Sequence, residues 1–296
     1  MSQSFAELKR SRQTNLDKLL QETNKLTSKE TSGGADTRFW QPSVDKAGNG
    51  YAVIRFLPAT KGEDIPWVRI FNHGFQGPGG WYIENSLTTL NKKDPVTEYN
   101  NMLWNRGDDT GKEQARKQKR RLLYVSNVYI INDSSNPENN GQVKLYRYGK
   151  KIFDKLNEAM NPQFEDENPI NPFDLWEGCN FKMKIRNLDG YRNYDKSEFE
   201  SPKPVLEDDA KMEEIWNSQY SLSEFTDPNK FKTYDELKEK LNRVLALNGS
   251  GQTLPNAEDT KLDSTPPPAV SKSMAPKKEV ADDGDELDFF EKLAND

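Results

Sequence analysis

Nucleophilic and metal-binding side chains are scarce in this sequence. Its 296 residues include one histidine, His73, and one cysteine, Cys179. A single cysteine excludes a disulfide within the chain, and two isolated residues do not make a convincing nucleophile and base. The sequence also lacks the G-x-S-x-G nucleophile turn and the glycine motif of dinucleotide-binding folds. We therefore expect a protein that is not an enzyme.

Long hydrophobic runs are absent too. Hydrophobic residues make up 33% of the chain, and the mean hydropathy is −0.98. No apolar run approaches the roughly 20 residues that span a bilayer, and the N-terminus has no apolar signal segment. The composition predicts a cytoplasmic protein with no membrane partner and with a hydrophobic core over only part of its length.

Positive charge is not in excess, but the acidic residues are unevenly placed. The net charge is −6, which by itself argues against nucleic-acid binding. Residues 279–296 carry eight acidic side chains and one lysine, so they account for −7 and residues 1–278 for +1. This asymmetry predicts separate binding and regulatory parts.

The acidic tail also contains apolar residues. A simple solubilising tail is the alternative, but it does not need two adjacent phenylalanines. Acidic residues around apolar anchors are typical of a segment that folds on binding a protein partner. The partner-binding candidates are Asp285, Leu287, Phe289, Phe290 and Leu293.

Periodicity and turn signals predict a mainly β core with accessory helices over residues 36–248, between a basic arm (1–35) and a disordered acidic tail (249–296). Strands are expected at 51–57, 67–72, 81–84, in the segment that ends near 132, and at 142–148 and 179–188. Helices are expected at 95–104, where Asp94 and Pro95 form a start signal, at 150–160, and within 207–248. The stretch 107–112 (GDDTGK) departs from a phosphate-binding loop in spacing and charge, so we expect an ordinary loop.

Residues 116–151 carry the clearest functional signal. A basic cluster precedes two expected strands, and on the second of these Lys144, Tyr146 and Tyr148 share one face while Arg147 lies on the other. Tyrosines beside lysines on an open face favour a single-stranded nucleic acid, because rings stack on bases and cations meet phosphates. An ordinary sheet with a solvated basic face is the alternative, since tyrosine is common in strands. The stretch 190–194 (GYRNY) repeats the pairing of aromatic and cationic residues, which favours nucleic acid.

A set of motifs, in one order over residues 40–200, resembles the helix-destabilising, single-stranded DNA-binding proteins of T-even-type bacteriophages. The motifs are AGNG at 47–50 with AVIRFLP at 52–58, NHGF at 72–75, WYIE at 81–84, PEN at 137–139 with Gly141, YR at 146–147 with GKKI at 149–152, WEG at 176–178, and GY at 190–191 with NYD at 193–195. No single motif is specific, but the ordered set is.

This resemblance implies an OB-fold core with a DNA cleft, an N-terminal arm for cooperative self-association, and an acidic tail that recruits replication and recombination proteins. The arm's candidates for self-association are Lys9, Arg10 and Arg12, although the family's compact basic run is interrupted here. If the chain is phage-encoded, the host cytoplasm is its expected location.

The resemblance also implies a structural zinc held by one histidine and three cysteines. His73 matches the histidine, but Ser86, Asp94 and Thr97 stand where the cysteines are expected. Structural zinc usually needs four Cys or His ligands, and Asp94 is already explained as a helix N-cap. We therefore expect a protein without zinc or any other cofactor.

Together these observations predict sequence-independent, cooperative binding of single-stranded DNA in replication, recombination and repair. The candidate aromatic contacts are Tyr124, Tyr146, Tyr148, Tyr191 and Tyr194. The candidate phosphate contacts are Arg55, Lys119, Arg120, Arg121, Arg147, Lys150, Lys151 and Arg192. The alternatives are an RNA-binding translational repressor on the same fold and a protein-interaction scaffold that binds no nucleic acid.

Overall fold

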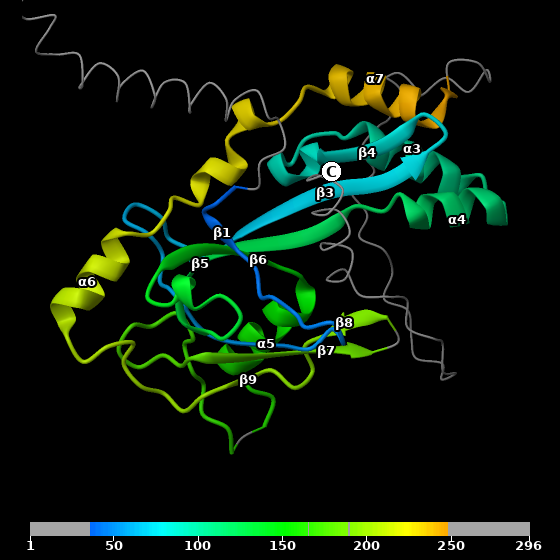
Figure 1. Ribbon diagram of the computed structural model, residues 1–296. Helices are drawn as coiled ribbons and strands as arrows, with labels where there is room; N and C mark the ends of the chain where they lie inside the picture. Colours follow the sequence, from blue (N-terminus) through cyan, green and yellow to red (C-terminus); the bar gives the residue numbers. More distant parts are fainter. Residues whose placement is uncertain (1–35, 165, 189, 248–296) are drawn as a thin grey trace, which may run out of the picture. The chain divides into compact units, whose positions relative to one another are not determined.

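The computed structural model describes residues 36–164, 166–188 and 190–247 (Figure 1). The residues expected in the arm, Lys9, Arg10 and Arg12, and those expected in the acidic tail lie outside this part of the chain. The described strands are β1 (Phe39–Trp40), β2 (Gly50–Phe56), β3 (Val68–Gly77), β4 (Gly80–Asn85), β5 (Arg121–Asp133), β6 (Val143–Tyr148), β7 (Phe181–Leu188), β8 (Tyr191–Asn193) and β9 (Glu198–Phe199).

The helices of the same residues complete a mixed α/β structure. The α-helices are α3 (Pro95–Asn105), α4 (Asp109–Lys117), α5 (Lys150–Met160), α6 (Asp209–Asn217) and α7 (Tyr234–Leu245). The short 3-10 helices are η1 (Leu87–Leu90), η2 (Pro137–Asn139), η3 (Ser223–Thr226) and η4 (Pro228–Lys230). Among the described residues, no helix combines the length and the apolar character needed to cross a bilayer.

Strand β5 is the centre of the sheet. Its 13 residues pair antiparallel with β2, β3 and β6, so one long strand joins the two halves of the sheet. The sheet runs in the order β1-β6-β5-β2-β7-β8, and β3 branches from β5 to carry β4. Only β1 and β6 pair in parallel among the described strands.

Two large hydrophobic clusters form most of the core. One is built on the sheet itself, with Ile54, Phe56 and Phe181 fully buried. The other joins β3 and β4 to α3, α4 and α7 through residues such as Tyr82 and Leu241. Figure 1 shows these three helices gathered around β3 and β4. The helices therefore enclose a core of their own and are more than accessories to a mainly β fold.

Local signals explain where the helices begin. Helix α3 starts as predicted, with Asp94 as N-cap and Pro95 in the first turn, and α5 spans the predicted residues 150–160. The expectation of a loop at 107–112 is wrong, because α4 begins at Asp109. The side chain of Asp108 accepts a hydrogen bond from the Gly111 N–H, and basic residues in the last turn complement the helix dipole. A Cβ on Gly111 would come within 2.9 Å of the Leu103 carbonyl oxygen, so glycine lets α4 approach α3 closely.

Candidate nucleic-acid interface

The tyrosines of β6 do not lie on an open face. Tyr146 is 3% exposed and Tyr148 is 1% exposed. The Tyr146 ring packs 5.3 Å from Trp40, and the Tyr148 hydroxyl lies 2.9 Å from the Ser126 hydroxyl. The expectation of exposed rings on this face is wrong because the Trp40 side chain of β1 and the rest of the sheet cluster pack against it. Sequence alternation identified the shared face but not what would pack against it.

Arg55 also has an internal role. Its side chain is completely buried, and its three nitrogens donate to Asn180 Oδ1 at 3.0 Å, the Asp174 carbonyl at 3.0 Å and the Lys203 carbonyl at 2.6 Å. Burial lowers the pKa of Arg55, and nearby acidic groups oppose that effect. The guanidinium therefore ties β2 to the loops that follow α5, and it is not presented to a phosphate.

The neighbouring face of β3 and β5 does combine aromatic and cationic side chains. Arg69 pairs with Tyr124 and Phe71 pairs with Leu122, so these four side chains lie on one side of the sheet. We call them the β3–β5 face. Arg69 is exposed, whereas Phe71 and Leu122 are half-buried. The strand register thus places the Arg69 cation beside the Tyr124 ring and an apolar side chain, Leu122, beside the Phe71 ring.

Residues from outside the two strands extend this face at both ends. At one end, the Arg120 guanidinium carbon lies 4.3 Å from the centroid of the Phe71 ring. At the other, the Tyr124 ring stacks on Phe153 of α5 with centroids 3.9 Å apart, and Phe153 contacts Trp67 edge-on at 5.5 Å. Both Phe153 and Trp67 are half-buried, so their ring edges stay within reach of a ligand.

Helix α5 adds positive charge beside Tyr124. Burial raises the pKa of Tyr124; the charges of Arg69 and Lys150 act against this rise, and the charge of Asp154 adds to it. Lys150 is exposed at the first position of α5 and also pairs with Asp154, whereas Lys151 is half-buried. The N-cap of the helix is Gly149, which has no side chain to accept a hydrogen bond, so the first N–H groups of α5 add to the positive potential.

The structure thus brings together part of the predicted set. Lys119 and Arg120 are exposed next to the β3–β5 face, and half-buried Arg121 donates to the Gly74 carbonyl at 3.0 Å. Arg147 lies elsewhere, with its guanidinium 4.6 Å from the Phe39 ring.

The β8 hairpin lies at the far end of the sheet order, with β2 and β7 between it and β5. Tyr191 is 49% exposed there, Arg192 is half-buried, and Tyr194 is buried at 8%.

Sequence reasoning missed several members of the interface. Trp67, Arg69 and Phe71 alternate along β3 in the same way as the residues of β6, so the signal was present in the stretch WVRIF. Phe153 of α5, which packs against Tyr124, is a further member. What the sequence could not show is that β3 pairs with β5 and brings these residues together.

Comparison with known proteins identifies the family. A family model described as "gp32 DNA binding protein like" matches residues 48–245. The chain belongs to this gp32-like family. A single-stranded DNA-binding protein of Enterobacteria phage T2 is 38% identical over 234 residues, which are 76% of each chain. A protein of the same name from Enterobacteria phage T4 is 36% identical over 249 residues, or 81% of each chain. Family membership confirms the expectation of a binding protein that is not an enzyme.

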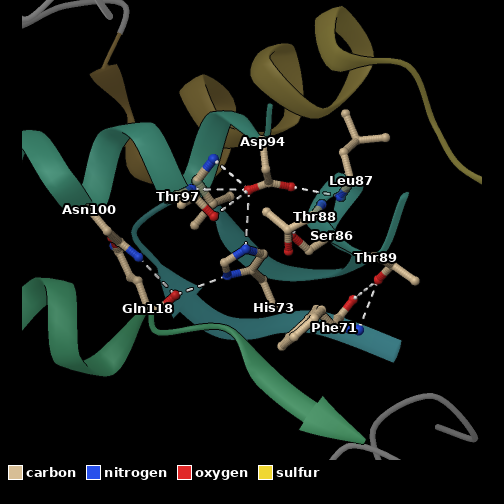
Figure 2. A network of polar contacts seen from close by, with 11 residues as sticks. Phe71, His73, Ser86, Leu87, Thr88, Thr89, Asp94, Thr97, Asn100 and Gln118 are labelled. Carbon is tan, nitrogen blue, oxygen red and sulfur yellow. Dashed lines mark hydrogen bonds and ion pairs between the residues drawn. The ribbon is translucent and has the colours of Figure 1, made fainter. Parts of the chain in front are cut away.

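The implied zinc position of this gp32-like chain holds a network of hydrogen bonds instead of a ligand set (Figure 2). His73 and Asp94 are each 1% exposed, and His73 Nε2 lies 3.2 Å from Asp94 Oδ1. The other ring nitrogen, Nδ1, lies 3.0 Å from the Gln118 carbonyl oxygen. Burial alone would raise the pKa of Asp94, but His73 and hydrogen bonds from Thr97 and Ser86 outweigh it and lower this pKa to about 2.

These residues do not fit a structural zinc. The described residues contain no cluster of three or more His, Cys, Asp or Glu side chains that could hold a metal ion. Ser86 and Thr97 offer hydroxyl groups, which are not among the usual zinc ligands. The oxygens of Asp94 already accept three backbone N–H groups. The chain's one cysteine, Cys179, is buried beside Arg55, far from this network in sequence and in the sheet.

Proposed function

We propose that this gp32-like chain binds single-stranded DNA without sequence preference and that the β3–β5 face is the centre of its binding surface. The single observation that carries this proposal is the alternation of cations and rings along this face: Arg120 lies over half-buried Phe71, and Arg69 pairs with buried Tyr124, which stacks on half-buried Phe153. Every base has a face that can stack on a ring, so such a surface binds strands of any sequence. The relatives from phages T2 and T4 are named for the same activity.

The contacts that we assign follow from exposure. Stacking is assigned to the half-buried rings of Phe71 and Phe153, and Tyr124, which is 5% exposed, supports the Phe153 ring from beneath. Phosphate contacts are assigned to cations around this face, namely Arg69, Lys119, Arg120, Arg121, Lys150 and Lys151. Tyr191 and Arg192 form a peripheral contact for a longer strand. Arg55, Tyr146, Tyr148 and Tyr194 act by holding the fold.

The sheet supports assignment of the core to the OB class. Strands β1, β6, β5, β2 and β7 form a continuous path with one parallel pair, and the parallel pair brings the start of the core beside β6. OB-folds are five-stranded, partly open barrels that bind single-stranded nucleic acids across one face. We propose that the core spans residues 36–248 and that β3, β4 and the helices around them are an addition to this barrel.

The two flanking segments complete the proposal. The arm, through Lys9, Arg10 and Arg12, contacts a neighbouring copy and makes binding cooperative. The acidic tail, residues 249–296, recruits replication and recombination proteins through the apolar residues near its end. These roles suit a protein of DNA replication, recombination and repair, working in the cytoplasm of the host cell.

Substitution of Phe71 by alanine tests the proposed surface. Loss of one stacking ring should weaken binding of oligo(dT) by about 1–3 kcal/mol, with the melting temperature measured in parallel. Trp176→Ala is the matched control, because Trp176 is 55% exposed but its indole N–H donates to the carboxylate of Asp209. Equal loss in both variants would place the binding surface elsewhere.

The same titration distinguishes the alternatives. If the chain binds oligo(U) more tightly than oligo(dT) of the same length, the result favours an RNA-binding repressor. Absence of salt-dependent binding to either strand would favour a protein-interaction scaffold, because phosphate contacts always make binding depend on salt.

A further inference from the structure

The buried carboxylate of Asp94 joins two elements at the start of α3. Its Oδ1 accepts the N–H groups of Val96 at 3.1 Å and Thr97 at 3.0 Å. Its Oδ2 accepts the N–H of Leu87, the first residue of η1, at 3.1 Å. A single side chain therefore fixes the turn between η1 and α3. A metal ion with several protein ligands could hold the same turn.

His73 carries this connection from Asp94 across to the segment before β5. One ring nitrogen lies 3.2 Å from Asp94 Oδ1, and the other lies 3.0 Å from the Gln118 carbonyl oxygen. Asn100 of α3 donates to the same carbonyl at 3.0 Å, so Gln118 is held from two directions (Figure 2). Gln118 is the C-cap of α4 and directly precedes Lys119 and Arg120.

The same short stretch of β3 that contains His73 also meets the basic residues. Arg120 lies over Phe71, and Arg121 donates to the carbonyl oxygen of Gly74. Together with the contact between His73 and Gln118, three successive attachments hold residues 118–121 along residues 71–74. Of these three contacts, the one between His73 and Gln118 is also connected to Asp94, through the other nitrogen of the His73 ring.

We propose that Asp94, His73 and Gln118 form a metal-free clamp that positions Lys119, Arg120 and the Phe71 ring for DNA binding. This inference rests on the proposed function, because the residues that it positions are those assigned to the strand. His73 and Asp94 touch no DNA in this account; they are positioning residues that act through the carbonyl of Gln118. The clamp replaces the cross-link that a bound metal would provide in the same place.

His73→Phe tests the clamp. Phenylalanine keeps a ring in the buried position but removes both nitrogens, while Asp94 keeps its N–H partners and Gln118 keeps Asn100. Amide hydrogen exchange of residues 118–122 should accelerate in the variant without DNA. The slope of log binding constant against log salt for oligo(dT) should fall by about one unit, because one or two phosphate contacts lose their fixed position. A chelator should change neither quantity in the wild-type chain.

Leu103→Ala is the matched control, because Leu103 is buried in the hydrophobic cluster that joins α3, α4 and α7 to β3 and β4 but is not one of the three clamp residues. This variant should lose thermal stability while keeping the wild-type salt slope and exchange of residues 118–122. If His73→Phe does not fold, Asp94→Asn carries the same comparison, since asparagine can still cap α3 but lacks the carboxylate that meets His73.

The outcomes separate the clamp from the proposed function. If the wild type binds oligo(dT) and Phe71→Ala weakens it, while His73→Phe matches wild type in salt slope and exchange, the clamp is refuted and the function stands. If Leu103→Ala alters both readouts as much as His73→Phe does, the effect is general destabilisation and the clamp is again refuted. If the wild type does not bind at all, the proposed function itself fails, and faster exchange in His73→Phe alone would still support the clamp.

Discussion

The guanidinium carbon of Arg120 lies over the half-buried ring of Phe71, 4.3 Å from its centroid. Arg120 follows α4 and Phe71 belongs to β3, so the contact joins two parts of the chain that are 49 residues apart. A cation on one side of the ring leaves the ring edge and the outer face of the guanidinium available to a base and a phosphate. This pair is the simplest unit of the surface that we assign to DNA.

Tyr146→Ala distinguishes a structural ring from a stacking ring. Because Tyr146 is 3% exposed and packs on Trp40 and Phe56, its loss should destabilise the fold by about 3–5 kcal/mol, the usual cost of removing a buried aromatic side chain. Affinity for oligo(dT), measured well below the melting temperature, should be nearly unchanged. Weaker DNA binding in a variant of undiminished stability would show that Tyr146 reaches the strand after all.

The stability of the chain should depend on the ionisation of Asp94 in acid. The folded-state pKa is lowered to about 2 from an ordinary 3.8, so its contribution is complete above about pH 4. That contribution is lost as the pH falls from about 4 to 2, and it amounts to about 2 kcal/mol. Urea unfolding across this range should show a steeper loss in wild type than in Asp94→Asn. Parallel curves for the two proteins would contradict the assigned contacts.

The chain should also be indifferent to metal removal. The donor set around His73 does not suit zinc, so treatment with a chelator should leave the melting temperature unchanged. Metal analysis of the purified protein provides an independent check. Stoichiometric zinc, released by the chelator with a fall in melting temperature, would contradict this prediction.

Deletion of residues 1–30 should separate affinity from cooperativity. If the arm contacts a neighbouring copy, the truncated protein should bind a short oligonucleotide as tightly as the full chain does. Binding to long single strands should become less cooperative. Binding isotherms measured with poly(dT) should therefore be shallower for the truncated protein. Identical isotherms on the long strand would remove the arm from self-association.

Local sequence signals predicted elements well where neighbouring residues determine them. Asp94 and Pro95 begin α3, and the alternation of Phe181, Met183 and Ile185 gives the buried side of β7. Local signals failed to predict which side chains are buried where contacts between distant parts of the chain determine burial. Tyr146 lies on the predicted strand, but the side chains of Trp40 and Phe56 pack on its ring, and no local pattern shows those distant contacts.

Two further differences have the same physical origin. The stretch 109–117 forms a helix because Asp108 caps it and Gly111 fits against α3, so tertiary packing outweighs the low helix propensity of its first residues. Arg55 was predicted to contact a phosphate, and a cation in an apolar strand does need a polar partner. Loops that follow α5 supply carbonyl groups from distant positions, so Arg55 is satisfied without a phosphate.

The most direct test of the DNA surface is the salt dependence of oligo(dT) binding by wild type and by Arg120→Ala. Wild type should show a linear fall of log binding constant with log salt, because bound phosphates release counterions. Removal of the Arg120 contact should reduce the slope by about 0.7, the value expected for one phosphate of a single strand, while the melting temperature changes little. A variant with the wild-type slope and affinity would contradict the placement of DNA on the β3–β5 face.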